Sequence, residues 1–168
     1  MTSAIEYELN DSIGTLRINQ EARHNALGAE ELDAIEEAMT TIARDDEIRV
    51  LIVTGAGQKT FCAGAALEDL GSGRITPDRF QGVMNRLATL AIPTIARLNG
   101  NVFGGGTELA LSCDFRIGTR EMRLRVPAAS IGLCYPPAGI TRFVARLGAG
   151  TARRMLVAAE TLTADELF

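Results

Sequence analysis

Segments with the apolar pattern of a strand alternate with segments of helical spacing along most of the chain. Residues 5–9 and 13–18 alternate apolar and polar side chains on either side of Asn10-Asp11, which predicts a β-hairpin. Further strands are expected at 50–53, 93–98, 115–118 and 124–126, and helices at 30–43, 80–90, 108–112, 140–147 and 151–159. This alternation predicts one α/β domain over residues 1–168, with layered helices and much parallel sheet.

Two expected loops, 61–66 and 101–106, place glycine and other small residues directly before a helix. In α/β sheets, ligands tend to bind at loops beyond the strand ends. The first N–H groups of a helix have no internal partner and carry partial positive charge, and glycine lets an acceptor oxygen approach them. Gly104–Gly106 therefore either binds an anion or a developing oxyanion, or only allows the helix to pack closely on a strand. A similar turn at Gly64 favours the first interpretation, because two turns could each offer one N–H to the same carbonyl oxygen.

Composition and motifs argue against several other kinds of site. The chain has 17 basic and 21 acidic residues, and its net charge of −4 argues against nucleic acid as the main partner. Residues 55–60 lack the glycine that precedes lysine in a phosphate loop, and 104–109 lack the last glycine of a dinucleotide-binding motif. The cysteines have no metal-binding spacing, so we expect reduced thiols, no metal site and a cytoplasmic protein. The sequence has no signal peptide and no apolar run of about 20 residues, so no membrane contact is expected.

The last segment, 162–168, begins like a helix, with Thr163 as its cap and Glu166 three residues later. The sequence stops within the first turns of this expected helix. We therefore expect that a C-terminal helical region is missing or truncated.

Eight short segments carry a resemblance that covers nearly the whole chain. They are RHNAL at 23–27, VTG at 53–55, FCAGA at 61–65, PTIA at 93–96, NG at 99–100, GGGTELA at 104–110, CD at 113–114 and IGL at 131–133. Each segment alone is a weak signal. Together, in this order and spacing, they resemble the crotonase, or enoyl-CoA hydratase/isomerase, superfamily.

The resemblance implies a spiral ββα core that binds acyl-CoA thioesters, with coenzyme A entering as part of the substrate and no permanently bound cofactor. The N–H groups of Ala65 and Gly105 would hold the thioester carbonyl and stabilise an enolate. The resemblance further places these residues at the substrate or coenzyme A: Arg23, Ala26, Leu27, Ala63, Ala66, Leu67 and Gly104. Arg23 suits a phosphate of the nucleotide. A homotrimer or hexamer is implied if the C-terminal helices are present.

The sequence departs from the family pattern at the acids of the site. Family hydratases use two glutamates, and one of them matches Glu108, three residues after Gly105. The other would follow Pro127, where this chain has Ala128, which argues against two-glutamate hydration and weakens simple isomerisation. Glu108 also has a simpler explanation, since an acid in the first turn of a helix is favoured by the helix dipole alone. Ala66 replaces an aspartate that ordinarily supports the turn.

Tyr135 is a second departure, in the turn that follows Gly132-Leu133. A tyrosine here resembles methylmalonyl-CoA decarboxylase, in which it lies near the substrate carboxylate, although that enzyme has histidine where this chain has Ala65. Alternatively, Tyr135 packs its ring and bonds its hydroxyl to the backbone. The sequence thus leaves three hypotheses: a hydratase/isomerase-family enzyme, a decarboxylase that uses Tyr135, or a non-catalytic homologue that binds coenzyme A.

Overall fold

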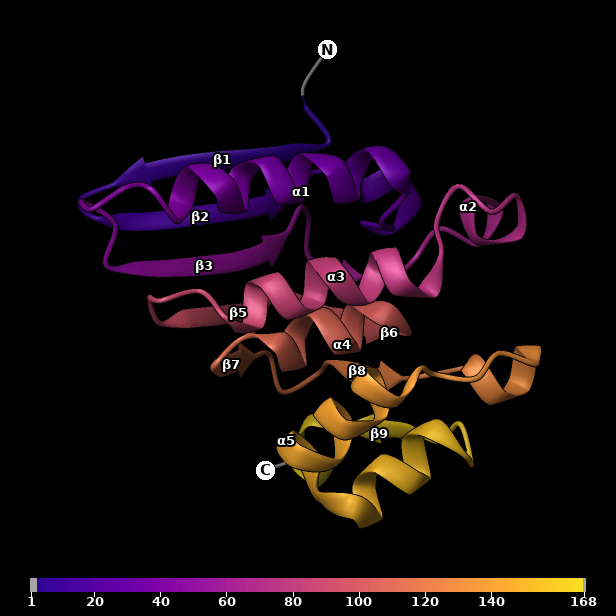
Figure 1. Cartoon of the computed structure of the whole chain (residues 1–168). Coiled ribbons are helices and arrows are strands. Elements are labelled where there is room, and N and C mark those ends of the chain that lie inside the picture. The colour runs from indigo at the N-terminus through magenta and orange to yellow at the C-terminus, as the bar shows by residue number, and fades with distance from the viewer. Residues whose placement is uncertain (1–2, 168) are drawn as a thin grey trace.

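The computed structural model describes residues 3–167, whose elements follow one another from one end of the molecule to the other (Figure 1). The strands are β1 (Ile5–Asn10), β2 (Ile13–Ile18), β3 (Val50–Gly55), β4 (Thr60–Cys62), β5 (Thr94–Leu98), β6 (Asn101–Phe103), β7 (Phe115–Gly118), β8 (Arg123–Arg125) and β9 (Thr161–Thr163). The helices are α1 (Ala29–Ile42), α2 (Leu67–Gly71), α3 (Pro77–Ala88), α4 (Gly105–Ser112) and α5 (Pro137–Leu156), with 3₁₀ turns at Glu21–Arg23, Ala128–Ile131 and Ala164–Glu166. Pairs of strands followed by a helix repeat along the chain, as the expected ββα spiral requires.

The strands of these repeats are divided between two sheets. The larger sheet has the order β1-β2-β3-β5-β7, in which only the β1–β2 hairpin is antiparallel. The smaller sheet has the order β4-β6-β8-β9, in which β4, β6 and β8 are parallel. Because parallel strands end at the same edge, the loops that follow β4 and β6 open side by side. The fold thus brings the two glycine turns together.

The helices pack in chain order over the sheets, α1 against α3, α3 against α4, and α4 against α5. In α1 and α3 the buried apolar residues recur at a spacing of three or four, so each of these two helices turns one apolar stripe to the core, whereas α4 is buried throughout Gly106–Ser112. In α1 these are Leu32, Ile35, Met39 and Ile42, and in α3 they are Phe80, Val83, Met84 and Leu87. Within residues 3–167, no helix is both long and apolar enough to cross a membrane.

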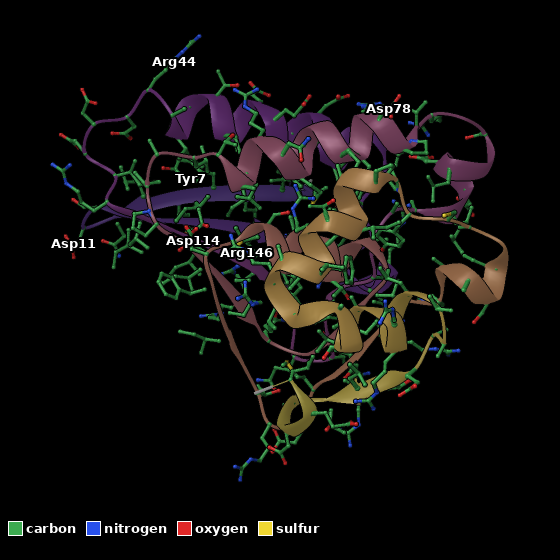
Figure 2. All side chains as sticks on the ribbon, turned by 60° about the horizontal axis from the view of Figure 1, so that its bottom comes forward. Tyr7, Asp11, Arg44, Asp78, Asp114 and Arg146 are labelled. Atoms are coloured by element: carbon green, nitrogen blue, oxygen red, sulfur yellow. The ribbon has the colours of Figure 1, made fainter. Side chains whose placement is uncertain are left out.

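The Cys113-Asp114 pair has a structural role at the start of β7. Oδ2 of Asp114 accepts hydrogen bonds from the backbone N–H and the hydroxyl of Thr94, each at 2.9 Å. Arg146 of α5 faces the same carboxylate, with Nη2 4.0 Å from Oδ1 (Figure 2). Cys113 itself is buried. This motif therefore joins β5, β7 and α5 rather than forming a site of its own.

Several sequence predictions need correction. Residues 60–62 form strand β4, although a loop was predicted over 61–66. Residues 101–103 form strand β6, whereas the sequence predicted a loop, because glycine and asparagine mask so short a strand. Helix α4 begins at Gly105, three residues before the expected start, so the glycines belong to its first turn. Segment 161–166 is strand β9 and a 3₁₀ turn rather than the start of an α-helix, although the predicted cap of Thr163 and Glu166 is present. Phe168 lies outside the described residues. The two predicted C-terminal helices are joined as α5, with a break at Gly148, whose φ is 77°.

Asp69 of α2 holds the beginning of α1. Its Oδ2 accepts the backbone N–H of Ala29 at 2.8 Å, and its Oδ1 accepts from Arg74 at 3.2 Å. We expect Asp69→Ala to lower the free energy of unfolding by about 1–2 kcal/mol in urea titrations, because a helix N–H loses its acceptor. Glu68→Ala is the matched control, since Glu68 is the exposed neighbour on the same helix. Equal losses in the two variants would contradict the capping role.

Candidate active site

The turn after β4 is fixed from one side by the loop that contains Leu27. The N–H of Leu27 donates to the Gly64 carbonyl and the N–H of Ala66 donates to the Leu27 carbonyl, both at 2.8 Å. Leu27 and Ala65 are therefore paired as in a parallel ladder. In such a ladder, the N–H of Ala65 itself points away from Leu27. Within residues 3–167 this N–H donates to no backbone carbonyl.

The start of α4 supplies a second N–H group of the same kind. Gly105 is the first residue of the helix, so its N–H has no acceptor inside the helix, and none is present elsewhere in the described chain. The next residue, Gly106, lies against β4, where a Cβ would come within 2.3 Å of the Cys62 carbonyl oxygen. The close packing predicted for the glycine run is therefore present at Gly106, and the N–H of its neighbour Gly105 has no acceptor in the described chain.

Gly64 brings the two turns into contact. Its φ is +87°, a conformation that favours glycine, and a Cβ at this position would lie 2.5 Å from the backbone nitrogen of Gly105. The turn that carries the Ala65 N–H thus passes directly beside the beginning of α4. The N–H groups of Ala65 and Gly105 come from different ββα units and lie on two turns that are in contact.

A cavity of about 270 Å³ opens at these turns. It is lined by Ala63, Ala65, Leu67, Leu70, Pro77, Phe80, Gln81, Gly104, Gly105, Glu108, Pro127, Ala128, Ile131, Leu133, Cys134, Tyr135 and Pro136. Most of the wall is apolar, and Glu108 is its one carboxylate. The sequence-predicted residues Ala63, Ala65, Leu67, Gly104, Gly105, Glu108 and Tyr135 are therefore brought together here.

Glu108 is almost completely buried, with 1% of its surface exposed. Its Oε1 accepts two hydrogen bonds, from Nε2 of Gln81 at 2.7 Å and from Nη1 of Arg142 at 2.6 Å. Its Oε2 accepts none from the residues that the structure describes. Burial raises the pKa of the Glu108 carboxyl, while the hydrogen bond from Gln81 and the charge of Arg142 lower it. A carboxyl with one oxygen uncommitted beside a cavity can take up or deliver a proton.

Sequence reasoning missed Gln81 and Arg142. Gln81 lies on α3 and Arg142 on α5, and they are 27 and 34 residues from Glu108. A buried carboxylate requires a charged or hydrogen-bonding partner, so the sequence alone could have predicted that one exists. It could not identify the partner, because only the packing of three helices brings these side chains together.

Tyr135 packs on α5 beside Glu108. Its ring meets the ring of Phe143 edge to face, with centroids 5.4 Å apart. Burial raises the pKa of its phenol, and the nearby Glu108 carboxyl raises it further, so the hydroxyl is neutral at physiological pH. The predicted ring packing is present. The hydroxyl donates no hydrogen bond within residues 3–167, so the expected bond to the backbone is not found.

Ala128 lies in the cavity wall, where the family pattern has a second acid. Its side chain is 8% exposed, and Pro127 beside it also lines the cavity. No other side chain of the wall replaces the missing carboxylate. Among the described residues, the cavity wall therefore carries a single carboxyl group, that of Glu108.

The predicted coenzyme A residues Arg23 and Ala26 do not line this cavity, and neither does Ala66. Arg23 is exposed, whereas the side chain of Leu27 is fully buried. Asn25 anchors their loop, because its Nδ2 donates to the carbonyls of Ala56 and Thr60 at 3.0 and 2.7 Å. This loop therefore contacts the turn after β4 through the backbone of Leu27. Its residue His24 lines the hollow described next.

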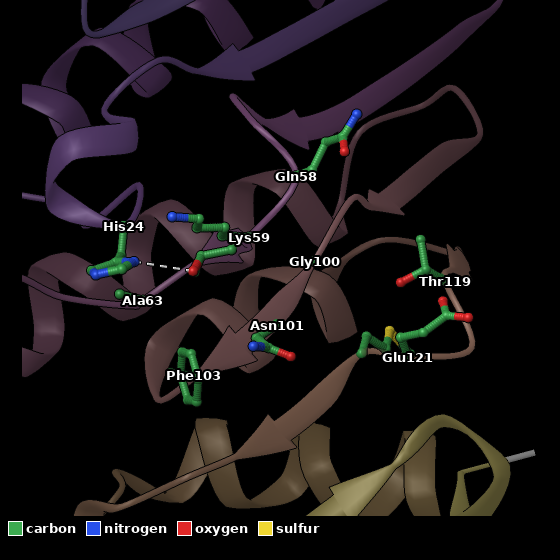
Figure 3. Close-up of a pocket in the computed structure, with 11 residues that line it drawn as sticks. His24, Gln58, Lys59, Ala63, Gly100, Asn101, Phe103, Thr119 and Glu121 are labelled. Carbon is green, nitrogen blue, oxygen red and sulfur yellow. Dashed lines mark hydrogen bonds between the residues drawn. The ribbon is translucent and has the colours of Figure 1, made fainter.

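A second hollow, of about 670 Å³, is also lined in part by Ala63 (Figure 3). It is lined by His24, Gln58, Lys59, Thr60, Ala63, Gly100, Asn101, Phe103, Thr119, Glu121 and Met122. Nδ1 of His24 lies 3.2 Å from the Thr60 hydroxyl, which joins the loop to β4. Ala63 borders both hollows, so an extended ligand that passes this residue could occupy both.

Comparison with known proteins assigns this arrangement to a family. The family model described as enoyl-CoA hydratase/isomerase matches residues 8–168. The chain belongs to the enoyl-CoA hydratase/isomerase family. The resemblance inferred from the eight sequence segments is therefore confirmed.

Several family members are similar over nearly the whole chain. The crotonyl-CoA hydratase of Syntrophomonas wolfei is 32% identical over 166 residues, which cover 96% of this chain and 64% of that protein. The short-chain-enoyl-CoA hydratase of Clostridium acetobutylicum is 32% identical over 164 residues, covering 95% and 63%. The crystal structure of an enoyl-CoA hydratase from Bacillus anthracis superposes with a TM-score of 0.91 at 30% identity, covering 98% and 66%. The chain thus has the crotonase fold and spans somewhat less than two thirds of the length of the first two relatives.

Proposed function

We propose that this family member acts on acyl-CoA thioesters and stabilises a thioester enolate. The carbonyl oxygen would accept the N–H groups of Ala65 and Gly105, which have no acceptor within the described backbone. The single observation that carries this proposal is the contact between the two turns at Gly64. Donors that are fixed before the substrate arrives stabilise developing negative charge without reorganisation. Coenzyme A would enter and leave with the substrate.

The two hollows fit the two ends of such a substrate. The cavity next to Glu108 is small and mostly apolar, which suits a short acyl group. The larger hollow carries Lys59, and the exposed Arg23 lies in the bordering loop, so two cations are available for phosphates. Ala63 lies between them, where the extended arm of coenzyme A would pass to present the thioester to Ala65 and Gly105.

We assign proton transfer at the acyl group to Glu108. Its Oε2 accepts no hydrogen bond from the described chain, and burial raises the pKa of its carboxyl, which favours a group that must both accept and donate a proton. Ala128 leaves Glu108 as the sole acid of the cavity. The reaction would therefore be a hydratase/isomerase-type proton transfer at the enolate in which one carboxyl group serves each proton step.

One observation favours a decarboxylase as the second candidate. Tyr135 lines the cavity and its hydroxyl is neutral and without a hydrogen bond to the described residues, so it could contact a polar substituent of the acyl group. Against this candidate, Glu108 is the acid of the wall, and in its ionised form it would repel a substrate carboxylate. The guanidinium of Arg142 is already engaged by Glu108 and Asn85.

Turnover of defined thioesters tests these proposals. We expect crotonyl-CoA or a 3-enoyl-CoA to be converted, followed as a change in enoyl absorbance, and methylmalonyl-CoA to release no CO₂. Release of CO₂ that falls in Tyr135→Phe would instead support the decarboxylase. Tight binding of acetoacetyl-CoA with no turnover of any thioester would support a non-catalytic homologue. Assembly as a trimer or hexamer is predicted for a protein in which the C-terminal helices are present, and sedimentation of such a protein would test it.

A further inference from the structure

A polar cluster behind the cavity connects three helices to Glu108. Arg142 of α5 lies between α3 and α4, and its side chain is 11% exposed. Nη1 donates to Oε1 of Glu108 at 2.6 Å, and Nη2 donates to Oδ1 of Asn85 on α3 at 2.6 Å. The guanidinium is thus held in one orientation by partners on two different helices. It does not line the cavity, so it would act on a substrate only through Glu108.

The cluster distinguishes the two oxygens of the Glu108 carboxylate. Arg142 and Gln81 both donate to Oε1, and Oε2 receives no donor from the described chain. The carboxylate is therefore fixed with Oε1 toward the helices. Gly139 closes this side, because a Cβ there would lie 3.1 Å from Oε1 and 3.0 Å from the Tyr135 ring. A substrate proton can reach only the oxygen that the cluster leaves uncommitted.

We propose that Arg142 is a positioning residue that keeps Glu108 ionised and directs Oε2 toward the substrate. The inference rests on the proposed function, in which Glu108 moves the proton. Burial disfavours the ionised carboxylate, and an adjacent guanidinium favours it. Asn85 supports this role one step further back, by fixing the second nitrogen of Arg142. The planar guanidinium donates from two nitrogens to two fixed acceptors, Oε1 of Glu108 and Oδ1 of Asn85, a geometry that the single point charge of an ammonium does not impose.

Other titratable groups near Glu108 do not compete for this role. Tyr135 faces it from the loop before α5, and burial keeps its phenol neutral. Cys62, on β4, is near Tyr135. Burial raises the pKa of the Cys62 thiol to about 12. Gln81 on α3 carries no charge. Arg142 is therefore the group whose removal changes the charge beside Glu108 at neutral pH.

The test compares the pH dependence of Arg142→Gln with that of Arg142→Lys. Without the cation, the pKa of Glu108 rises, so the acidic limb of kcat/KM with crotonyl-CoA should move to higher pH by about one unit or more. Arg142→Lys keeps the charge, so its limb should stay near that of the wild type while kcat falls, because one hydrogen bond is lost. Arg153→Gln, on the exposed side of the same helix, is the matched control and should leave the profile unchanged.

A second readout does not depend on turnover. The carboxyl carbon of Glu108 in ¹³C-glutamate-labelled protein, assigned through Glu108→Gln, should titrate at higher pH in Arg142→Gln and, by a smaller amount, in Asn85→Ala. An inactive wild type whose Glu108 still shows this shift would defeat the proposed function and leave the positioning role standing. Unchanged titration in Arg142→Gln would overturn the inference, and so would equal losses at every pH in Gln and Lys variants. If Arg142→Gln does not fold, unchanged titration in Asn85→Ala would overturn it.

Discussion

Glu108→Gln is expected to lower kcat on the productive thioester by about 10²–10⁴-fold, the usual contribution of a positioned acid–base group. Glutamine retains the size of the side chain and can still accept hydrogen bonds from Gln81 and Arg142 through its amide oxygen. It cannot take up a proton at neutral pH. Binding of acetoacetyl-CoA should therefore change little while turnover is lost, and stopped-flow measurement of both quantities separates the two effects.

The matched control for this variant is Glu31→Gln. Glu31 is also a buried glutamate, 4% exposed, and its Oε2 accepts the Gly28 N–H at 2.7 Å and its Oε1 the Gln20 side chain at 2.7 Å. It caps α1 and lies outside the cavity wall. Glu31→Gln should reduce stability and leave kcat unchanged. A Glu108→Gln variant that retains most of its turnover would return Glu108 to the simpler role of an acid favoured by the helix dipole.

The sequence predicted most of the strands and helices because their patterns are local. The β1–β2 hairpin, β3, β5 and the apolar stripes of α1 and α3 follow from alternation and spacing within each segment. Strand β6 was missed because it has only three residues and stops directly before Gly104, so it is too short to show an alternation of apolar and polar residues. Strand β6 pairs with β4 and β8, which are at least 20 residues away along the chain, so the pairing cannot be recognised from the local sequence.

In the candidate site, too, the residues with a local signal could be predicted and the residues brought in by tertiary packing could not. The two glycine turns and Glu108 could be singled out from local features, a turn and the first residues of a helix, and the family resemblance then pointed to Ala65 and Gly105. The family resemblance placed Tyr135 and Ala128, which line the same cavity. Arg142 was not predictable, because its relation to Glu108 depends on how α5 crosses α4 and α3. A buried carboxylate requires a charged or hydrogen-bonding partner, but which residue is the partner depends on tertiary packing.

Gly64→Ala is expected to lower kcat by about 10²–10³-fold, the usual cost of losing one oxyanion donor. The new Cβ would lie 2.5 Å from the Gly105 nitrogen and must push the two turns apart. The donors would then no longer converge on one oxygen. Because this interaction is strongest in the transition state, kcat should fall more than substrate affinity. Steady-state kinetics with crotonyl-CoA, together with acetoacetyl-CoA binding, measures the difference.

Backbone strain alone could also impair Gly64→Ala, so the control must share the strain without the contact. Gly73→Ala meets this need, because Gly73 has a φ of +75° and nothing within 4 Å of a new Cβ. It should lose stability and retain kcat. A backbone ester at Gly105 removes the N–H while adding no side chain, and it should reproduce the kinetic loss of Gly64→Ala with little change in packing. Full activity in the ester variant would show that the Gly105 N–H is not a donor to the substrate, and the loss in Gly64→Ala would then come from displacement of α4 and with it of Glu108, three residues further along the helix.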